Sequence, residues 1–323
     1  MPALNTHGKL NYLAPEVSSS LFRNGEVLIR RNTQGSDSGE KGVRIASHTM
    51  PIADARALAT AEAPTVARNG FELISSPLAN ADLDFLNHET VVRDYYPQCV
   101  AAVEAATGAR AYAFDHNVRS AAGKKSKKQI DGGQEVQGPA HVVHGDYTLT
   151  SAPQRLRDLT QPPAINDTYK FMLADGASLV DTATAHQALS KDGRFAIINV
   201  WRNIAPEPVA THPMAFCDGQ SVEPADLVVF EIHYADRIGE NYFAKQVDRH
   251  QWSYFPQVTR DEAILIKQWD SAGPLAASNG ARSDASDPDA PCSFSFHSAF
   301  EDPNTPDGAP DRWSIEVRCL VVY

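Results

Sequence analysis

Three side chains in this 323-residue sequence are arranged in a way that suits a transition metal. One glycine separates His144 from Asp146, and His297 follows in the apolar segment Ser293–Phe300. Residues two apart in a strand point to the same face, so His144 and Asp146 can bind one ion together. Two histidines and one carboxylate form the facial ligand set of mononuclear non-haem iron sites, which leaves coordination positions open. The sequence therefore predicts a metal site at His144, Asp146 and His297.

The His-x-Asp pair is a weak signal by itself. The sequence holds 11 histidines and 40 acidic residues, so such pairs arise by chance. The alternative is that His144 is a core histidine whose ring nitrogen is satisfied by Asp146 or by a carbonyl. A further pattern near the C-terminus favours the metal site.

That pattern is a predicted strand that alternates polar and apolar side chains. One face carries Arg312, Ser314, Glu316 and Arg318, and the other carries Trp313, Ile315 and Val317. The Arg312-x-Ser314 pair offers a guanidinium fork and a hydroxyl, which suit a distal carboxylate such as that of 2-oxoglutarate. The alternative is an exposed polar face with a Glu316–Arg318 ion pair. Arg318 could replace Arg312 as the anchor, and the sequence leaves that choice open.

These segments resemble the CmcJ/AsaB-type hydroxylase–desaturases. That family is similar to iron- and 2-oxoglutarate-dependent enzymes of secondary metabolism, and it includes a gibberellin desaturase and a cephamycin-pathway protein. The resemblance runs from about Phe114 to the C-terminus. Its markers are Phe114–Arg119, Pro139–Thr148, Ile198–Asn203, His250–Pro256, Asp261-Glu262, Lys267–Ser271, Phe296–Pro303 and Arg312–Arg318.

The resemblance implies iron ligands at His144, Asp146 and His297 and an arginine on the last strand for the co-substrate. It implies Fe(II), 2-oxoglutarate and O₂ as cofactors, and hydroxylation, desaturation or cyclisation of a small, apolar secondary-metabolite intermediate. Two positions depart from the family pattern. Gly145 stands where a larger residue is expected, and Asn203 ends a Trp-Arg-Asn sequence where Trp-Arg-Pro is expected.

Other side chains are candidates for co-substrate or substrate contacts. Asn199 could bind the co-substrate carboxylate. Trp201 lies on the same strand face and could line the pocket, or it could simply belong to the core. We expect substrate contacts at His116, Arg119 and Tyr147, although His116 is equally compatible with a structural histidine.

The elements that must position these residues are mainly short strands. We expect strands at 111–119, 142–148, 194–201, 227–233, 263–269, 293–300 and 314–322 and extended chain over 21–45. Helices are expected at 54–62, 154–159 and 88–107, the last capped by Asn87, kinked at Pro97 and ended by Gly108. The polar Ala121–Gly138 segment reads as an exposed loop that could cover a pocket.

Recurring short strands with Pro, Gly and Asp turns predict a mainly β fold with supporting helices, a double-stranded β-helix (jelly roll, cupin-like). We expect one such domain over residues 1–323 with an N-terminal α/β extension.

Composition narrows the function further. The net charge of −11 argues against a nucleic-acid or membrane partner, and no apolar run of about 18 residues is present. The N-terminus lacks a secretory signal pattern, and four scattered cysteines indicate a reducing, cytoplasmic location. We therefore expect a small-molecule substrate, while a homo-oligomer stays open. The alternatives are a cupin-like metalloenzyme that does not use 2-oxoglutarate and a non-catalytic small-molecule binding barrel.

Overall fold

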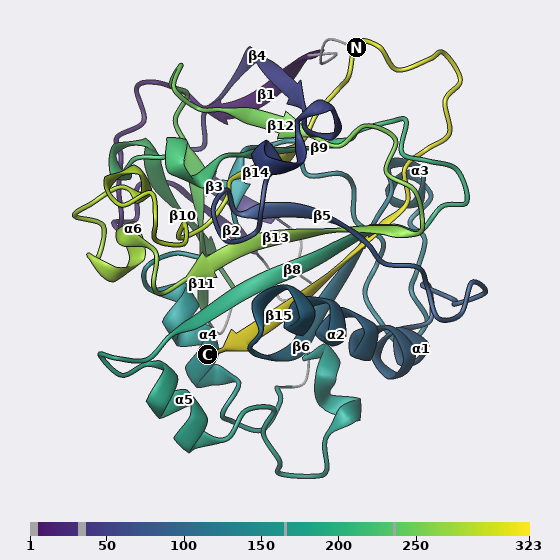
Figure 1. Ribbon diagram of the computed structural model, residues 1–323, viewed down its shortest axis with the longest axis vertical. Helices are drawn as coiled ribbons and strands as arrows, with labels where there is room; N and C mark the ends of the chain where they lie inside the picture. The colour runs from purple at the N-terminus through teal and green to yellow at the C-terminus, as the bar shows by residue number, and fades with distance from the viewer. Residues whose placement is uncertain (1–5, 32–36, 165–166, 235–236) are drawn as a thin grey trace.

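The computed structural model describes residues 6–31, 37–164, 167–234 and 237–323. Two β-sheets face each other (Figure 1). The larger sheet has ten strands, in the order β1 (Thr6–Leu13), β4 (Ile45–Asp54), β12 (Trp252–Tyr254), β9 (Met214–Cys217), β14 (His297–Ala299), β7 (His144–Gly145), β11 (Ile238–Ala244), β10 (Leu227–His233), β2 (Leu28–Arg31) and β3 (Asp37–Lys41).

The smaller sheet has five strands and is antiparallel throughout. Its order is β5 (Phe71–Ser75), β13 (Glu262–Asp270), β8 (Phe195–Asn203), β15 (Ser314–Val322) and β6 (Arg110–Arg119). Every residue of β8 is buried, because this strand lies in the middle of the sheet and both of its faces are covered. β6 is an edge strand, and on its outer side Arg119 forms an isolated bridge with Gln137.

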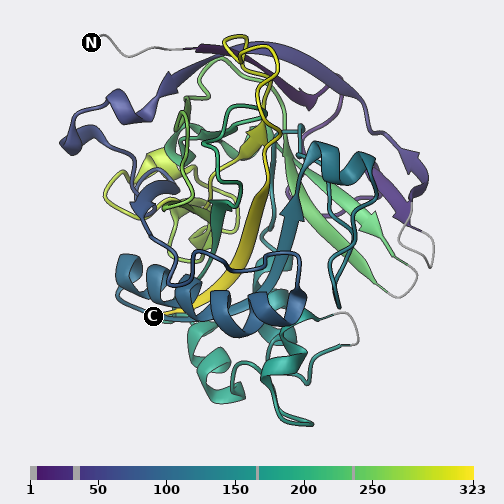
Figure 2. The ribbon, with the colours of Figure 1, turned by 90° about the vertical axis from the view of Figure 1, so that its right-hand side faces the viewer.

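Helices cover the outer face of the smaller sheet. They are α1 (His88–Thr90), the π-helical turn η3 (Val91–Tyr95) and α2 (Tyr96–Thr107), and Figure 2 shows them along one side of the molecule. Val103 of α2 packs in one apolar cluster with Ile315 and Val317 of β15. Elsewhere lie α3 (Ala121–Lys125), α4 (Ser151–Asp158), α5 (Thr182–Ala188), α6 (Pro274–Ala277), η1 (Ala55–Ala57), η2 (Thr60–Glu62), η4 (Thr168–Met172), η5 (Gly219–Ser221), η6 (Pro224–Asp226) and η7 (Asp284–Ser286).

A second apolar cluster fills the space between the two sheets. It joins Tyr242 and Phe296 from the larger-sheet side to Ile197, Trp269 and Leu320 of the smaller sheet. Burying a side chain of this size contributes roughly 1.5–3 kcal/mol each. Two facing sheets around a common core confirm the predicted mainly β jelly roll with supporting helices.

Several predicted elements are confirmed. The strands at 227–233 and 314–322 have the predicted bounds. The predicted 88–107 helix is present as α1, η3 and α2, with Asn87 Oδ1 accepting from Thr90 N and Gly108 ending α2 at φ +67°. The predicted irregularity takes the form of η3, and Pro97 lies in the first turn of α2, where its missing N–H costs little.

Other predictions were wrong in extent or type. The expected helix at 54–62 is absent, because β4 continues to Asp54 and only the 3₁₀ turns η1 and η2 follow. Pairing of β4 with β12 reaches Asp54, so the first residue of the predicted helix belongs to a strand. The expected strand at 142–148 shrinks to His144–Gly145. None of the helices in the described ranges has the length and apolar character needed to cross a bilayer.

Asn87→Ala should lower the free energy of unfolding by about 1 kcal/mol, because it removes the side-chain oxygen that caps α1. Urea denaturation followed by circular dichroism measures this change. Asn87→Ser keeps a capping oxygen and should retain most of the stability. Equal losses in both variants would contradict a capping role.

Candidate metal centre

The three predicted ligands meet between the sheets, although 150 residues separate Asp146 from His297. β7 and β14 are neighbouring strands, and His144 pairs directly with His297 across them. One ligand atom from each of His144, Asp146 and His297 lies within 4.8 Å of the other two. The two imidazole centroids are 4.4 Å apart, and His144 Nε2 is 3.6 Å from Asp146 Oδ1.

The protonation of these groups suits a cation. His144 Nδ1 donates to Val142 O at 2.7 Å, since a carbonyl only accepts, which leaves the Nε2 lone pair free to bind a metal. Burial lowers the pKa of His144 to about 4 and also lowers the pKa of His297, so both rings are neutral at pH 7. Metal ligation requires neutral imidazoles and an ionised carboxylate. His297 Nδ1 is buried and has no partner within the described residues.

Asp146 is held by residues of the opposite sheet. Its Oδ2 accepts from Asn199 Nδ2 at 3.1 Å and from Arg318 Nε at 3.3 Å. Burial opposes ionisation, but the Arg318 guanidinium, the two neighbouring histidines and the hydrogen bond from Asn199 together outweigh it and hold the pKa of Asp146 below its usual range. Because Oδ2 is engaged, Oδ1 is the oxygen that stays available for a metal. Arg318 Nη1 in turn donates to Asp115 Oδ2 at 2.7 Å, so two carboxylates compensate its charge.

Arg312 and Ser314 differ from Arg318 in that they hold unused donors. Arg312 is 2% exposed, and its Nε and Nη2 lack partners among the described residues, as does Ser314 Oγ. Arg312 Nη1 donates to His212 O, and the guanidinium lies 5.6 Å from the centroid of the Trp201 ring. Burial lowers the pKa of Arg312 to about 9, which leaves it charged at pH 7. Buried donors without partners indicate a missing acceptor.

The structure brings together most of the sequence-predicted site residues. Arg119, Trp201 and Arg318 line the same cavity as the three ligand residues. Arg119 pairs with Ser314 across β6 and β15 and donates to Gly138 O at 2.9 Å. Tyr147 is partly buried against the apolar cluster between the sheets and is not among the residues that line the cavity.

His116 points to the other face of the smaller sheet, away from the ligands. The register of β6 against β15 shifts between Asp115 and Ala113, which marks a β-bulge at Phe114. A bulge inserts one residue and reverses the direction of the following side chains. Phe114 and Asp115 therefore both face the space between the sheets, and His116 faces helix α2, where it contacts Tyr96.

The sequence reasoning missed four residues of this centre. Asp115 binds Arg318, Glu316 lines the cavity and contacts Asn199, and Gln268 Oε1 accepts from Asp146 N at 3.0 Å. The amide oxygen of Asn117, oriented to suit both groups, accepts from Arg318 Nη1 at 2.8 Å. Asp115 and Asn117 alternate with period two along a strand that ends in Arg119, and this pattern was the signal in the sequence that could have identified both residues.

Residues 10–322 match the family described as oxidoreductase/YMDC permease-like domain. The uncharacterized protein in the dcmA 3′ region of Methylophilus leisingeri is 43% identical over 197 residues, which cover 61% of this chain and 89% of that protein. The alpha-ketoglutarate-dependent dioxygenase phiK of a fungal species is 30% identical over 261 residues, 79% of this chain and 78% of phiK.

The hydroxylase/desaturase poxK of Penicillium oxalicum is 28% identical over 256 residues, 72% of this chain and 66% of poxK. The solved structure of the iron and alpha-ketoglutarate-dependent endoperoxidase NvfI superposes with a TM-score of 0.71 at 22% identity, over 98% of both chains. These names confirm the predicted resemblance to hydroxylase–desaturases, and the superposition confirms the fold.

Wild-type protein should bind one Fe(II) per chain under anaerobic conditions, and Asp146→Ala or His297→Ala should weaken binding by at least about 100-fold. Removing a direct ligand costs more than the 10–100-fold typical of its supporting residues. Equilibrium dialysis with a colorimetric iron assay measures the affinity. His141→Ala is the matched control, because His141 lies near in sequence but outside the ligand group. Unchanged affinity in Asp146→Ala would contradict the site.

Asp115→Asn should weaken Fe(II) binding roughly tenfold, because Arg318 loses one of its carboxylates and orients Asp146 less tightly. The same dialysis assay applies. Asp94→Asn serves as the control, since Asp94 is an exposed acid paired only with its neighbour Arg93. Equal effects of the two substitutions would show that Asp115 has no positioning role.

Proposed function

This chain belongs to the oxidoreductase/YMDC permease-like family, and we propose that it acts as an Fe(II)- and 2-oxoglutarate-dependent oxygenase. Its reaction is the hydroxylation, desaturation or cyclisation of a small secondary-metabolite intermediate. One observation carries the proposal. Arg312 lies two residues before β15, is buried, and has two nitrogens without partners among the described residues, and β15 faces a His-Asp-His ligand group.

The residues around the proposed metal site have different roles. His144, Asp146 and His297 would hold Fe(II) as a two-histidine, one-carboxylate ligand set. With Fe(II), 2-oxoglutarate and O₂ bound, the centre would supply an oxidant strong enough to remove hydrogen from a substrate C–H bond. Arg318 and Asn199 hold Asp146 through Oδ2 and leave Oδ1 available as a ligand atom. Trp201 and Met214 contribute apolar surface to the lining of the cavity.

Arg312 and Ser314 bind the far carboxylate of 2-oxoglutarate. They offer three unused donor atoms, whereas the guanidinium of Arg318 is already paired with Asp146 and Asp115. A carboxylate at Arg312 would compensate a buried charge that forms no ion pair with an acid among the described residues. The sequence left the choice between Arg312 and Arg318 open, and the unused donors of Arg312 favour Arg312 as the anchor.

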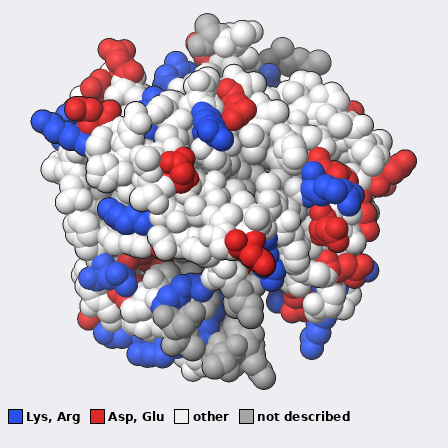
Figure 3. All heavy atoms as spheres, turned by 90° about the horizontal axis from the view of Figure 1, so that it is seen from below, with Lys and Arg blue, Asp and Glu red and all other residues white. Residues whose placement is uncertain are grey.

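Partners and location follow from the surface and the cysteines. All four cysteines are buried and free, as expected in a reducing compartment, so we place the protein in the cytoplasm. On the face seen in Figure 3, acidic and basic side chains are both present, and in several places they lie next to each other. With a net charge of −11, this distribution favours a small-molecule substrate over nucleic acid.

Anaerobic titration of the Fe(II)-loaded protein with 2-oxoglutarate tests the function. Wild type should develop the weak visible charge-transfer band of an Fe(II)–2-oxo-acid chelate, and His297→Ala should not, because it loses a metal ligand. Absence of the band in iron-loaded wild type would overturn the 2-oxoglutarate assignment.

Arg312→Gln should raise the Kd for 2-oxoglutarate by at least about tenfold at saturating Fe(II), since a charge-assisted hydrogen bond contributes roughly 1.5–3 kcal/mol. Ser314→Ala should raise it a few-fold. Arg318→Gln is the matched comparison and should weaken Fe(II) binding instead, because its partner is Asp146. The visible band measures 2-oxoglutarate binding and dialysis measures Fe(II) binding, so the two assays separate these effects. Weaker 2-oxoglutarate binding in Arg318→Gln, with unchanged binding in Arg312→Gln, would assign the carboxylate anchor to Arg318.

A further inference from the structure

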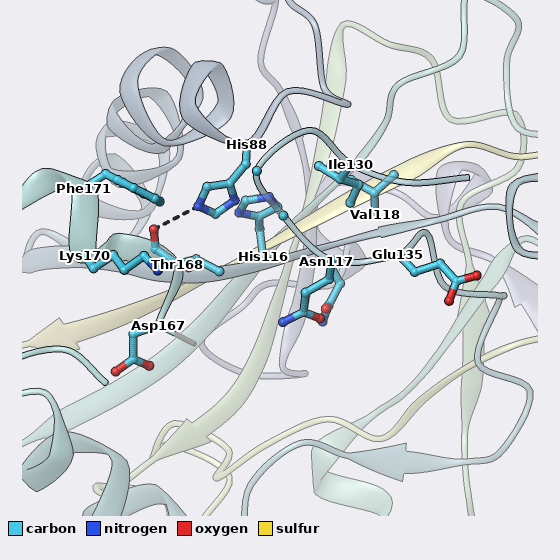
Figure 4. Close-up of a pocket in the computed structure, with 13 residues that line it drawn as sticks. His88, His116, Asn117, Val118, Ile130, Glu135, Asp167, Thr168, Lys170 and Phe171 are labelled. Atoms are coloured by element: carbon cyan, nitrogen blue, oxygen red, sulfur yellow. Dashed lines mark hydrogen bonds between the residues drawn. The ribbon is translucent and has the colours of Figure 1, made fainter. Parts of the chain in front are cut away.

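A second cavity lies at the outer edge of β6, beside the metal centre, and we call it the β6-edge cavity. It measures about 170 Å³ and is lined by His116, Asn117 and Val118 of β6, by residues 130–135 of the following loop and by η4. Figure 4 shows the rings of His88 and His116 side by side, with Asn117 next along the same strand. Their centroids are 5.1 Å apart.

The β6-edge cavity and the metal cavity are neighbours along one strand. Asn117 lines the first, and Arg119 lines the second. Side chains two residues apart on one strand face are about 7 Å apart. Asn117 also accepts from both terminal nitrogens of Arg318, at 2.8 and 3.1 Å, and Arg318 Nε binds Asp146. A single side chain therefore separates the β6-edge cavity from the residue that holds the ligand carboxylate.

Hydrogen-bond donors and acceptors fix the protonation of His116. Thr168 Oγ1 donates to Phe114 O at 3.0 Å, because a carbonyl only accepts. Its one proton is thus used, and in the 2.9 Å contact with Thr168 Oγ1 the Tyr96 hydroxyl is the donor. Tyr96 keeps this proton, since burial raises its pKa well above the usual value. The Tyr96 oxygen then accepts from His116 Nδ1–H at 2.9 Å.

His116 Nε2 is consequently an acceptor. Burial lowers the pKa of His116 to about 4, so the ring is neutral at pH 7 and carries one proton, on Nδ1. Its Nε2 has no hydrogen-bond partner in the part of the chain that the structure describes, and the residue lines the β6-edge cavity. The ligand group that satisfies this lone pair is a hydrogen-bond donor, such as a hydroxyl or an amine.

The size of the cavity and the side chains at its rim indicate what kind of group carries this hydroxyl or amine. An apolar cavity of about 150 Å³ accommodates benzene, so the β6-edge cavity has room for one six-membered ring with its substituent. Phe171 and Met172 are 59% and 45% exposed, and both belong to η4, where Phe171 also lines the cavity. The exposed ring of Phe171 favours a ligand with an apolar body, and the charged Glu135, Asp167 and Lys170 beside it favour polar substituents on that body.

We propose that the β6-edge cavity binds a ring of the substrate that carries a hydroxyl or an amine, with His116 Nε2 accepting its hydrogen bond. The remainder of the substrate passes Asn117 to reach the metal cavity, which Fe(II) and 2-oxoglutarate occupy. This inference rests on the proposed function, because it assigns the cavity to the substrate of the metal centre.

Three ring probes of similar size test the inference: cyclohexanol, cyclohexylamine and methoxycyclohexane, which lacks a donor. NMR titration of the metal-free full chain gives each Kd, and the ¹⁵N resonance of His116 Nε2 reports on the bond directly. Cyclohexanol or cyclohexylamine should bind wild type about tenfold more tightly than methoxycyclohexane, the effect of one hydrogen bond. The tighter of the two identifies the donor as hydroxyl or amine.

His116→Asn and His116→Gln form a matched pair of variants. The Asn amide lies where Nδ1 was and can still donate to Tyr96, so this variant keeps the buried contact but loses the acceptor. His116→Asn should abolish the tenfold preference, and His116→Gln, whose amide oxygen reaches the position of Nε2, should retain it. A preference that persists in His116→Asn, or equal binding of all three probes to wild type, would overturn the inference.

These titrations contain neither iron nor 2-oxoglutarate. A protein that binds cyclohexanol at His116 but gives no visible band with Fe(II) and 2-oxoglutarate would overturn the proposed function while leaving the donor-binding cavity in place. The reverse result would leave the oxygenase assignment standing and remove the substrate assignment of the β6-edge cavity.

Discussion

The metal centre depends on one ion pair between the two sheets, that of Asp146 with Arg318. Asp146 follows β7 of the larger sheet, and Arg318 belongs to β15 of the smaller sheet. Burying a charged pair is costly unless each charge is fully compensated. Here Arg318 binds the carboxylates of Asp146 and Asp115, and Asn199 also binds Asp146. The pair therefore fixes the separation and register at which the sheets face each other around the ligands.

Strand β15 combines the core and the site in one alternating pattern. Its apolar residues Ile315 and Val317 pack against the helical layer with α2. Its polar residues lie on the opposite face, where Glu316 and Arg318 line the metal cavity. A shift of one residue would exchange the two faces and would bury charges against α2. The packing of the core and the position of the site residues thus require the same register of β15 in its sheet.

Two adjacent spaces at the centre are built from different chemistry. The space between the sheets is rich in charge, with Arg119, Arg318, Glu316 and Asp146 around the ligands. The β6-edge cavity is lined by the neutral His116, the apolar Phe171 and the charged Glu135, Asp167 and Lys170. Variation in the loop and in η4 can therefore alter what the β6-edge cavity binds without disturbing the pair of Asp146 with Arg318.

Local patterns in the sequence determined the candidate site residues and the bounds of one helical region. Period-two alternation placed His144 beside Asp146 and Arg312 beside Ser314, and capping signals bounded the helical region after Asn87. These features depend on neighbours within a few residues, so the sequence is sufficient to find them. The pair of His144 with Asp146 was predicted on this basis. The family was predicted from a resemblance carried by motifs between Phe114 and the C-terminus, and it is confirmed by the match over residues 10–322.

Only the tertiary structure decided which arginine is free and which way His116 points. Arg312 and Arg318 look alike in the sequence, and they differ because Asp146 and Asp115, which lie more than 170 residues away along the chain, pair with Arg318. The bulge at Phe114 reverses the faces of β6, and it is visible only in the register against β15. Contacts between distant segments have no local signature, because they arise only when the sheets close around a common core.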